Sequence, residues 1–379
     1  MRRLMPWRLV QLALVAAALA LLGACGSDDG ADVREVGSEG SASASASGSA
    51  SGSASGSATA SPSATGGLGG YEPVSDVGSH AKVSLDVAEI GALLEAETVD
   101  YEAVRDLYAE GENSVSGDGS TRTLKGFATE ERDEPIWNDY TAFYDDPAWL
   151  DTFVTQAIAG SGPFEGASGD VRKEAIQKGV QNGIMIAWTL HELVGAEEKV
   201  AAGEVDPAEG APHNVDEAWA FYHGEDPDGA PFATADKRGA DFGTGSAVNE
   251  AILARMTEAR EAAEAGDAAG LKAASEEIRR QIVITYVQAA TKYATTADQA
   301  LEAGESEEAR VQQAEGLAFY RVVATLLAAA DEAAAAEVLE AFDIEAGPAE
   351  GMAERVTAAL EGAYGALGIT AEEVGTFGG

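Results

Sequence analysis

The sequence has few of the residues that build thiol, disulfide or strongly basic sites. In 379 residues it contains one cysteine, four histidines, and 24 lysines and arginines against 65 aspartates and glutamates. The single cysteine, Cys25, excludes an internal disulfide, and the rest of the chain offers no thiolate as a nucleophile or metal ligand. A formal charge of −41 repels phosphate, so we expect no nucleic acid partner. Solubility alone would explain this acidity, and any metal site must use oxygen and nitrogen ligands.

The motifs of common enzyme classes are also missing. The sequence has no nucleophile elbow, no phosphate-binding glycine loop and no dinucleotide fingerprint. His191-Glu192 begins like a zinc metalloprotease motif, but the position four residues after His191 is Gly195, so the second histidine is absent. We therefore expect a protein that is not an enzyme.

The N-terminus has the parts of a lipoprotein signal peptide. Three arginines lie before and at the start of an apolar stretch, Leu9 to Leu22, whose 14 residues fall short of the roughly 20 that span a bilayer. The tetrapeptide that ends at Cys25 resembles a lipobox, in which the cysteine sulfur receives a diacylglycerol. We expect residues 1–24 to be removed and Cys25 to anchor the chain to the outer side of the cytoplasmic membrane. The alternative is an uncleaved signal anchor with an incidental cysteine.

The segment that follows, residues 25–70, is predicted to be a lipidated cysteine and a disordered tether. Residues 41–65 are almost entirely Ser, Ala and Gly, with one proline, Pro62, and no large apolar side chain. Such a segment cannot bury enough surface to offset the entropy of ordering it. The tether should hold the domain away from the lipid surface.

The remaining 309 residues, 71–379, are predicted to form an all-α extracytoplasmic domain. Alanine is abundant, alternation with a period of two is scarce, and apolar residues recur with helical spacing. Long helices with short connections indicate a large up-and-down helical bundle, as one unit or as two packed half-bundles. The predicted helices are 84–96, 100–110, 136–144, 147–159, 170–202, 215–223, 232–240, 246–265, 267–303, 306–341 and 350–366.

An irregular insertion is predicted between residues 204 and 245, where prolines and glycines cluster around one short helix. Loops on a rigid helical frame often carry function. His213 and His223 flank that short helix, as candidate ligands or as solvated surface residues.

His191 lies on a polar stripe of the 170–202 helix, together with Gln177 and Gln181. One interpretation is a hydrogen-bonded core histidine. The other is a ligand for a cation inside the bundle, with the neighbouring Glu192 as a second ligand.

A second candidate group lies in the short helix of the insertion. Asn214 and Glu217 have the spacing of a capping box. In that case the negative charge of Asp216 would interact favourably with the positive end of the helix dipole. Alternatively, Asp216, Glu217 and His223 belong to a metal site. Tyr222 is expected to pack in the core or to serve as a phenolate ligand for ferric iron.

Four segments resemble the low-iron-inducible periplasmic protein family, the algal iron-assimilation proteins with bacterial relatives. They are Gln177 to Gly183, Asn214 to Tyr222, Ala230 to Arg238 and Phe242 to Thr244. The resemblance covers most of residues 71–379 and implies an all-helical extracytoplasmic protein associated with iron uptake. It supplies no ligand set that can be carried over residue by residue.

We therefore expect a lipid-anchored, extracytoplasmic iron-binding protein that captures iron and passes it to a transporter. Carboxylates suit ferric iron and neutral imidazoles suit ferrous iron, so the oxidation state stays open. The alternative is a cell-envelope scaffold without metal. Binding requires at least three of the candidate side chains to converge, whereas a scaffold would expose an apolar patch of several hundred Å². The candidate ligands are His191, Glu192, Asp216, Glu217, Tyr222 and His223.

Overall fold

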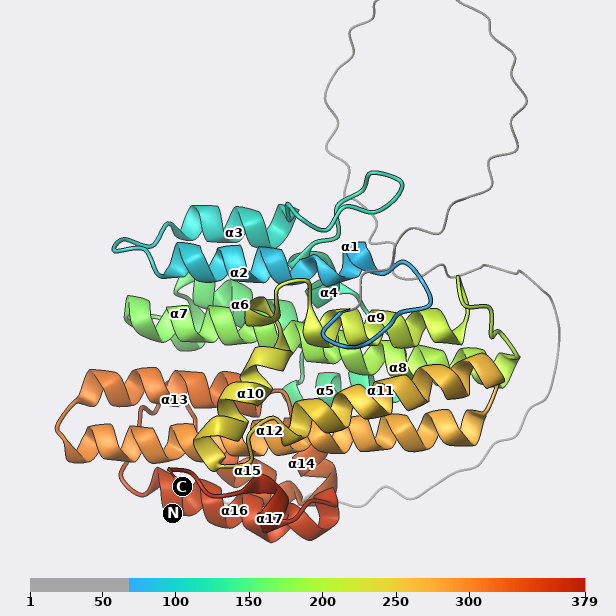
Figure 1. The fold of residues 1–379 in the computed structure, drawn as a ribbon. Helices are drawn as coiled ribbons and strands as arrows, with labels where there is room; N and C mark the ends of the chain where they lie inside the picture. Colours follow the sequence, from blue (N-terminus) through green and yellow to red (C-terminus); the bar gives the residue numbers. More distant parts are fainter. Residues whose placement is uncertain (1–67, 379) are drawn as a thin grey trace, which may run out of the picture. The chain divides into compact units, whose positions relative to one another are not determined.

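The helical periodicity of the sequence is realised throughout the part of the chain that the structure describes. The computed structural model describes residues 68–378, which contain no strand and only two isolated β-bridges (Figure 1). The all-α fold class is therefore confirmed. Cys25, the predicted signal peptide and the predicted tether up to residue 67 lie outside the described residues.

The observed helices agree closely with the predicted set, except in three regions considered below. Three short helices, α1, α4 and α17, were not predicted. The α-helices are α1 (Gly78–Ala81), α2 (Val83–Leu94), α3 (Tyr101–Glu110), α4 (Leu124–Thr129), α5 (Pro135–Tyr144), α6 (Trp149–Ala159), α7 (Gly169–Lys178), α8 (Met185–Ala202), α9 (Ala211–His223), α10 (Pro231–Phe242), α11 (Ala247–Ala265), α12 (Ala268–Glu302), α13 (Ser306–Tyr320), α14 (Ala324–Ala330), α15 (Glu332–Ala341), α16 (Met352–Leu367) and α17 (Ala371–Val374).

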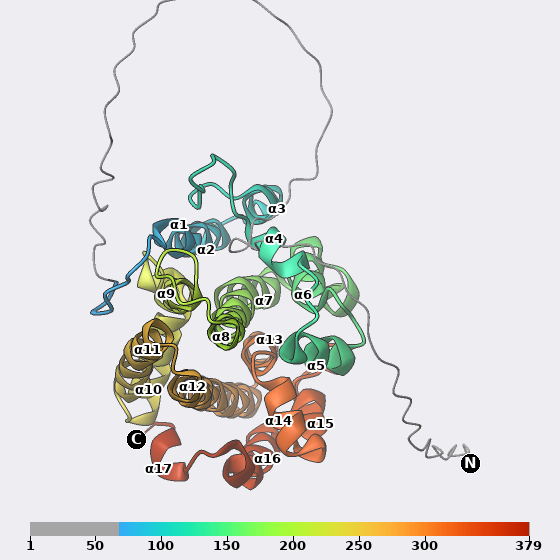
Figure 2. The same ribbon diagram turned by 90° about the vertical axis from the view of Figure 1, so that its right-hand side faces the viewer.

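The core of the bundle is built around α12, which packs against α8, α10, α11, α13 and α16 (Figure 2). Short connections join α11 to α12 and α12 to α13, so these helices run up and down as predicted (Figure 1). At the first connection Gly266 has a left-handed φ of 65°, and the side chain of Asp267 accepts a hydrogen bond from Gly270 N. These residues end one helix and start the next within a single turn.

A π-helical turn, η2 (Gly179–Ile184), interrupts the predicted helix 170–202 between α7 and α8. Its Gln181 Nε2 donates to the carbonyl oxygens of Asp228 and Ala230, and its Asn182 accepts from the hydroxyl of Tyr286. Gln181 of the polar stripe is thus a structural residue that holds the start of α10.

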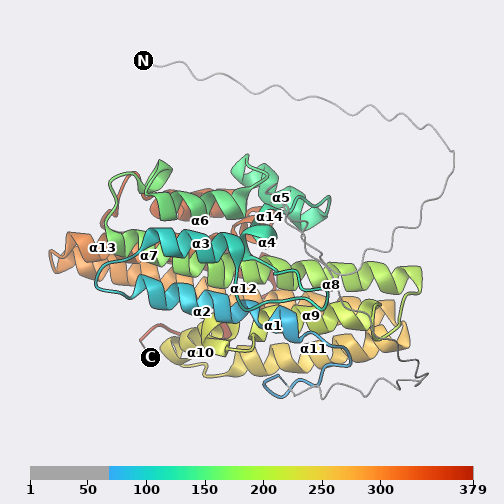
Figure 3. The same cartoon turned by 90° about the horizontal axis from the view of Figure 1, so that it is seen from above.

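The predicted insertion 204–245 is more helical than expected. Helix α9 is almost entirely buried and packs along α8 and α11, so it belongs to the bundle (Figure 3). Pro212, Pro227 and Pro231 occupy the first turns of α9, of the 3-10 helix η3 (Pro227–Gly229) and of α10. A proline there loses no helical hydrogen bond, so these prolines start helices where the sequence suggested loops.

The predicted helix 306–341 was wrong as a single element. The chain turns after α13 at residues 321–323, and Asp331 caps the start of α15. Tyr140 donates to the carbonyl of Val322, and Arg321 donates to the carbonyl of Trp149 at 2.7 Å. The Tyr140 hydroxyl of α5 thus satisfies a carbonyl that the break exposes, and the Arg321 side chain ties the break to the start of α6. In residues 68–378 no helix has both the length and the apolar composition needed to cross a membrane.

Candidate functional site: a buried histidine and glutamate cluster

Four ionisable side chains from three helices meet inside the bundle. They are His80 of α1, Glu192 of α8, and His213 and Glu217 of α9; we call them the HE cluster. Helix α9 packs against both α8 and α1 (Figure 3). His213 and Glu217 are four residues apart and therefore share one face of α9.

Glu217 is the centre of the HE cluster. Its Oε1 atom lies 3.1 Å from His80 Nε2 and 3.0 Å from His213 Nε2, and its side chain is 1% exposed. Neither contact has hydrogen-bond geometry, and in residues 68–378 both carboxylate oxygens of Glu217 and both ring nitrogens of His80 are buried without a hydrogen-bond partner. A proton on Glu192 would give Glu217 one hydrogen bond and leave His80 without any in this part of the chain. Buried polar atoms of this kind are rare in native proteins and require an explanation, such as a bound ion.

The two carboxyl groups of the HE cluster differ in protonation. Burial, followed by the charge of Glu217, raises the pKa of Glu192 well above its ordinary value. Burial also opposes the charge on Glu217, but the imidazoles of His80 and His213 outweigh it and lower the pKa of Glu217 to about 2. A proton taken up by this pair therefore goes to Glu192, and the negative charge stays on Glu217.

The two imidazoles differ as well. Burial lowers the pKa of His80 to about 4, so this ring is neutral at physiological pH. Burial disfavours the charged form of His213 too, but its contact with Glu217 outweighs this effect and raises the pKa of His213. Of the two rings, His213 is therefore the one that takes up a proton first and places a positive charge opposite Glu217.

The structure brings two of the six predicted ligands, Glu192 and Glu217, into the HE cluster. A third, His191, lies at its edge. Its Nδ1 atom is 2.7 Å from Glu134 Oε1, and its Nε2 atom is 4.0 Å from Glu192 Oε1. The ring packs against Trp137 and Trp188 in the core, but within the described residues its Nδ1 atom is buried without the hydrogen bond that the core interpretation expected.

The other three predicted ligands point elsewhere. Asp216 accepts hydrogen bonds from Tyr71, Val74 and Ser75. Tyr222 is buried and donates to Asn249 Oδ1 at 2.6 Å. Burial raises the pKa of the Tyr222 hydroxyl well above its ordinary value, which disfavours the phenolate.

His223 faces the aromatic packing at the other end of α9. It stacks on Trp219, and its Nδ1 atom lies 2.8 Å from the carbonyl oxygen of Gly224. The ring is buried, so the expectation of a solvated surface residue was wrong for His223.

Sequence reasoning did not select His80, and it named His213 as a candidate ligand but left it out of the final set of six. For His213 the signal was present, because His213 and Glu217 have the i, i+4 spacing of one helical face. It was overlooked because α9 was predicted to start after Asn214, whereas its N-cap is Gly210. The capping-box interpretation was therefore wrong: Asn214 lies inside α9 and donates to Glu192 Oε2 at 2.7 Å.

The chemistry of the HE cluster fits iron, since imidazole and carboxylate are its common protein ligands. In residues 68–378, however, no group of three or more His, Cys, Asp or Glu side chains is arranged as a preformed metal site. The two imidazoles approach the same oxygen of Glu217 at pairing distance. A cation must therefore replace these contacts as it binds.

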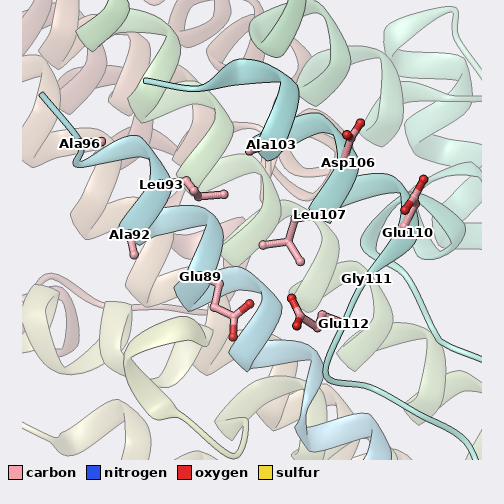
Figure 4. A pocket seen from close by; sticks show the side chains of 10 residues that line it. All are labelled: Glu89, Ala92, Leu93, Ala96, Ala103, Asp106, Leu107, Glu110, Gly111 and Glu112. Carbon is pink, nitrogen blue, oxygen red and sulfur yellow. The ribbon is translucent and has the colours of Figure 1, made fainter. Parts of the chain in front are cut away.

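A surface hollow of about 710 Å³ lies elsewhere, between α2 and α3 (Figure 4). Leu93 and Leu107 lie between these helices, with carboxylates around them. The hollow contains no imidazole and shares no residue with the HE cluster. The carboxylates are Glu89, Asp106, Glu110 and Glu112.

Comparison with known proteins gives one match. The family model described as "Low iron-inducible periplasmic protein" matches residues 45–379, which include every residue of the HE cluster. No curated protein and no solved structure matches the chain significantly.

Proposed function

The chain belongs to the family of low iron-inducible periplasmic proteins, and we propose that it binds iron at the HE cluster. The family match confirms the resemblance noted in the sequence. The observation that carries the proposal is Glu217, a carboxylate 1% exposed that lies about 3 Å from two imidazoles without a hydrogen bond. A cation between these groups would give a partner to His80 Nε2, which residues 68–378 alone leave unpaired, and would lie against the charged Glu217 carboxylate.

The protonation pattern supports a site that exchanges protons for a cation. The raised pKa values of Glu192 and His213 favour the protonated forms of both side chains. Ligation requires deprotonated carboxylates and neutral imidazoles, so binding would release these protons. His80 is already neutral and Glu217 already ionised, which gives an arriving cation two ready ligands.

We propose ferrous iron as the cargo. Two imidazoles with two carboxylates suit Fe²⁺, whereas the phenolate that would favour Fe³⁺ is disfavoured at Tyr222. Zinc shares this ligand chemistry, so it is the competitor to measure.

The family description supports a location in the periplasm or its equivalent outside the cytoplasmic membrane. We propose that Cys25 anchors the chain there and that the protein delivers iron to a transporter without catalysing a reaction. The rival scaffold would need an apolar contact surface. In residues 68–378 Val74 and Val115 are the only large hydrophobic side chains more than about a third exposed, which gives a scaffold little support.

The test is calorimetric titration of the full chain, purified without chelator, with ferrous, ferric and zinc ions. We expect ferrous iron to bind and to raise the melting temperature, because a ligand that binds only the folded state stabilises it by about 2.7 kcal/mol at 100 times its Kd. Glu217→Gln keeps the shape of the side chain and should weaken binding more than about tenfold.

The matched control is His223→Gln, which alters a buried histidine of the same helix outside the HE cluster. It should leave the affinity within about threefold of wild type. Absence of ferrous binding by the wild-type chain contradicts the proposal, and so does equal binding by Glu217→Gln.

A further inference from the structure

We infer that Ser75 and Asp216 are positioning residues of the cation site, which fix the tautomer of His213 and hold the segment Leu68–Lys82 against α9. This inference rests on the proposed function of the HE cluster. It gives a role to Asp216, a predicted ligand whose side chain bonds to Tyr71, Val74 and Ser75 and does not join the HE cluster.

Asp216 fastens the segment through four hydrogen bonds. Its Oδ1 atom accepts from the hydroxyl of Tyr71 at 2.7 Å. Its Oδ2 atom accepts from Val74 N at 2.8 Å, from Ser75 N at 2.8 Å and from Ser75 Oγ at 2.7 Å. Asp216 is fully buried, and hydrogen bonds to an ionised acceptor are stronger than neutral ones.

The hydroxyl of Ser75 connects Asp216 to His213. Ser75 Oγ lies 2.8 Å from His213 Nδ1. A serine hydroxyl has one proton, and here it is donated to Asp216, so Ser75 Oγ must accept from an Nδ1–H group of His213. The neutral His213 ring then carries its lone pair on Nε2, the nitrogen that lies 3.0 Å from Glu217.

This arrangement presents His213 to a cation. In metal sites the second ring nitrogen of a histidine ligand usually donates to a carboxylate, a carbonyl or a water, which fixes the tautomer and the ring orientation. Here the chain of hydrogen bonds runs from His213 through Ser75 to Asp216. Asp216 and Glu217 are adjacent in the sequence, so one turn of α9 supplies both a ligand and the support for another.

The segment also supplies the other imidazole. Trp219 Nε1 donates to the carbonyl of Leu68 at 3.0 Å, and Glu225 N donates to the carbonyl of Ala81 at 2.8 Å. These bonds fix both ends of the segment, and His80 lies between them. Displacement of the segment would therefore remove His80 from Glu217 and Ser75 from His213 together.

Cation binding and docking of the segment are consequently linked. A cation held by His80 and His213 stabilises the segment in its docked position. By reciprocity, a change that weakens the packing of the segment against α9 lowers the affinity for the cation. The segment is the part of the chain that connects residues 1–67 to the bundle. The stability of the docked segment and the affinity for iron should therefore change together.

The experiment uses the full chain with Ser75→Ala and Asp216→Asn, and Asp298→Asn as the matched control. Asp298 also accepts three backbone hydrogen bonds, from Gly351, Met352 and Ala353, but far from the HE cluster in the fold. We expect ferrous affinity to fall about 10- to 100-fold in the first two variants and to stay within about threefold in the control. Hydrogen exchange of residues 68–82 should slow on adding ferrous iron to wild type.

A measurement without iron tests the tautomer directly. In long-range ¹H–¹⁵N spectra of the iron-free chain at a pH where His213 is neutral, we expect His213 to be the Nδ1–H tautomer in wild type and a mixture in Ser75→Ala. If the wild-type chain fails to bind iron, the proposed function falls, and the spectra still decide the role of Ser75. If wild type binds iron and Ser75→Ala binds equally well, or if Asp298→Asn is as weak as Asp216→Asn, the inference is overturned and the proposed function stands.

Discussion

Asn214 on α9 and Glu192 on α8 are joined by a buried hydrogen bond of 2.7 Å from Nδ2 to Oε2. The amide reaches this position because Gly195, one turn after Glu192, has no side chain. A Cβ atom at Gly195 would lie 3.0 Å from Asn214 Nδ2. The residue that breaks the metalloprotease motif in the sequence is thus the one that admits the amide partner of Glu192.

Replacing Asn214 with alanine should destabilise the protein by about 1–3 kcal/mol, because it leaves a buried carboxyl oxygen without its donor. Urea unfolding measures the change. Asn138→Ala is the control, since Asn138 makes the same type of bond to Asp133 at an exposed position, where the effect should stay within about 0.5 kcal/mol. Equal losses in the two variants would show that burial of the bond is unimportant.

His80 should make stability depend on pH. Its folded pKa of about 4 lies below the ordinary value of 6.5, so the unfolded chain takes up the proton first as the pH falls. The contribution of the neutral His80 ring to the free energy of unfolding is complete above about pH 6.5. It is lost toward pH 4, and the loss is at most about 3 kcal/mol. Between pH 7 and pH 5 the unfolding free energy of wild type should therefore fall more than that of His80→Gln. Parallel pH profiles would contradict a neutral, buried His80.

His191→Ala should weaken ferrous binding less than His213→Ala does. His191 pairs with Glu134 and lies 4.0 Å from Glu192, whereas His213 lies 3.0 Å from Glu217. The loss of aromatic packing with Trp188 should instead lower the melting temperature without metal. Calorimetric titration and thermal unfolding of both variants separate the two effects. A larger affinity loss for His191→Ala would move the site toward Glu134.

Cys25→Ser should release the protein from membranes into the soluble fraction, because Cys25 is the only residue that can carry the predicted lipid. Fractionation of cells that produce each form measures this. The circular dichroism spectrum should stay helical in both forms. If Cys25→Ser still requires detergent for extraction, the predicted anchor is wrong.

Much of the fold could be predicted because helices show in the local spacing of apolar residues along the sequence. The 35-residue α12 was predicted to within one residue at each end, since its apolar residues repeat with helical period. The breaks were not predictable in the same way. The turn after α13 is held by Tyr140 and Arg321 through carbonyls of distant segments, and the π-turn η2 is tied to the start of α10.

The sequence by itself determined that the chain is helical, acidic and limited to oxygen and nitrogen ligands. It contains the four-residue spacing of His213 and Glu217, but the observed start of α9 at Ala211 was needed to place both on one helical face. Only the tertiary structure decided that His80 meets them, since α1 reaches α9 through packing between segments far apart in the chain. It also decided that Asp216 serves the segment before α1 while its neighbour Glu217 faces the imidazoles. The side chains of adjacent helical residues point about 100° apart, so Asp216 and Glu217 face different neighbours. The rest of the fold decides which of the two faces the imidazoles.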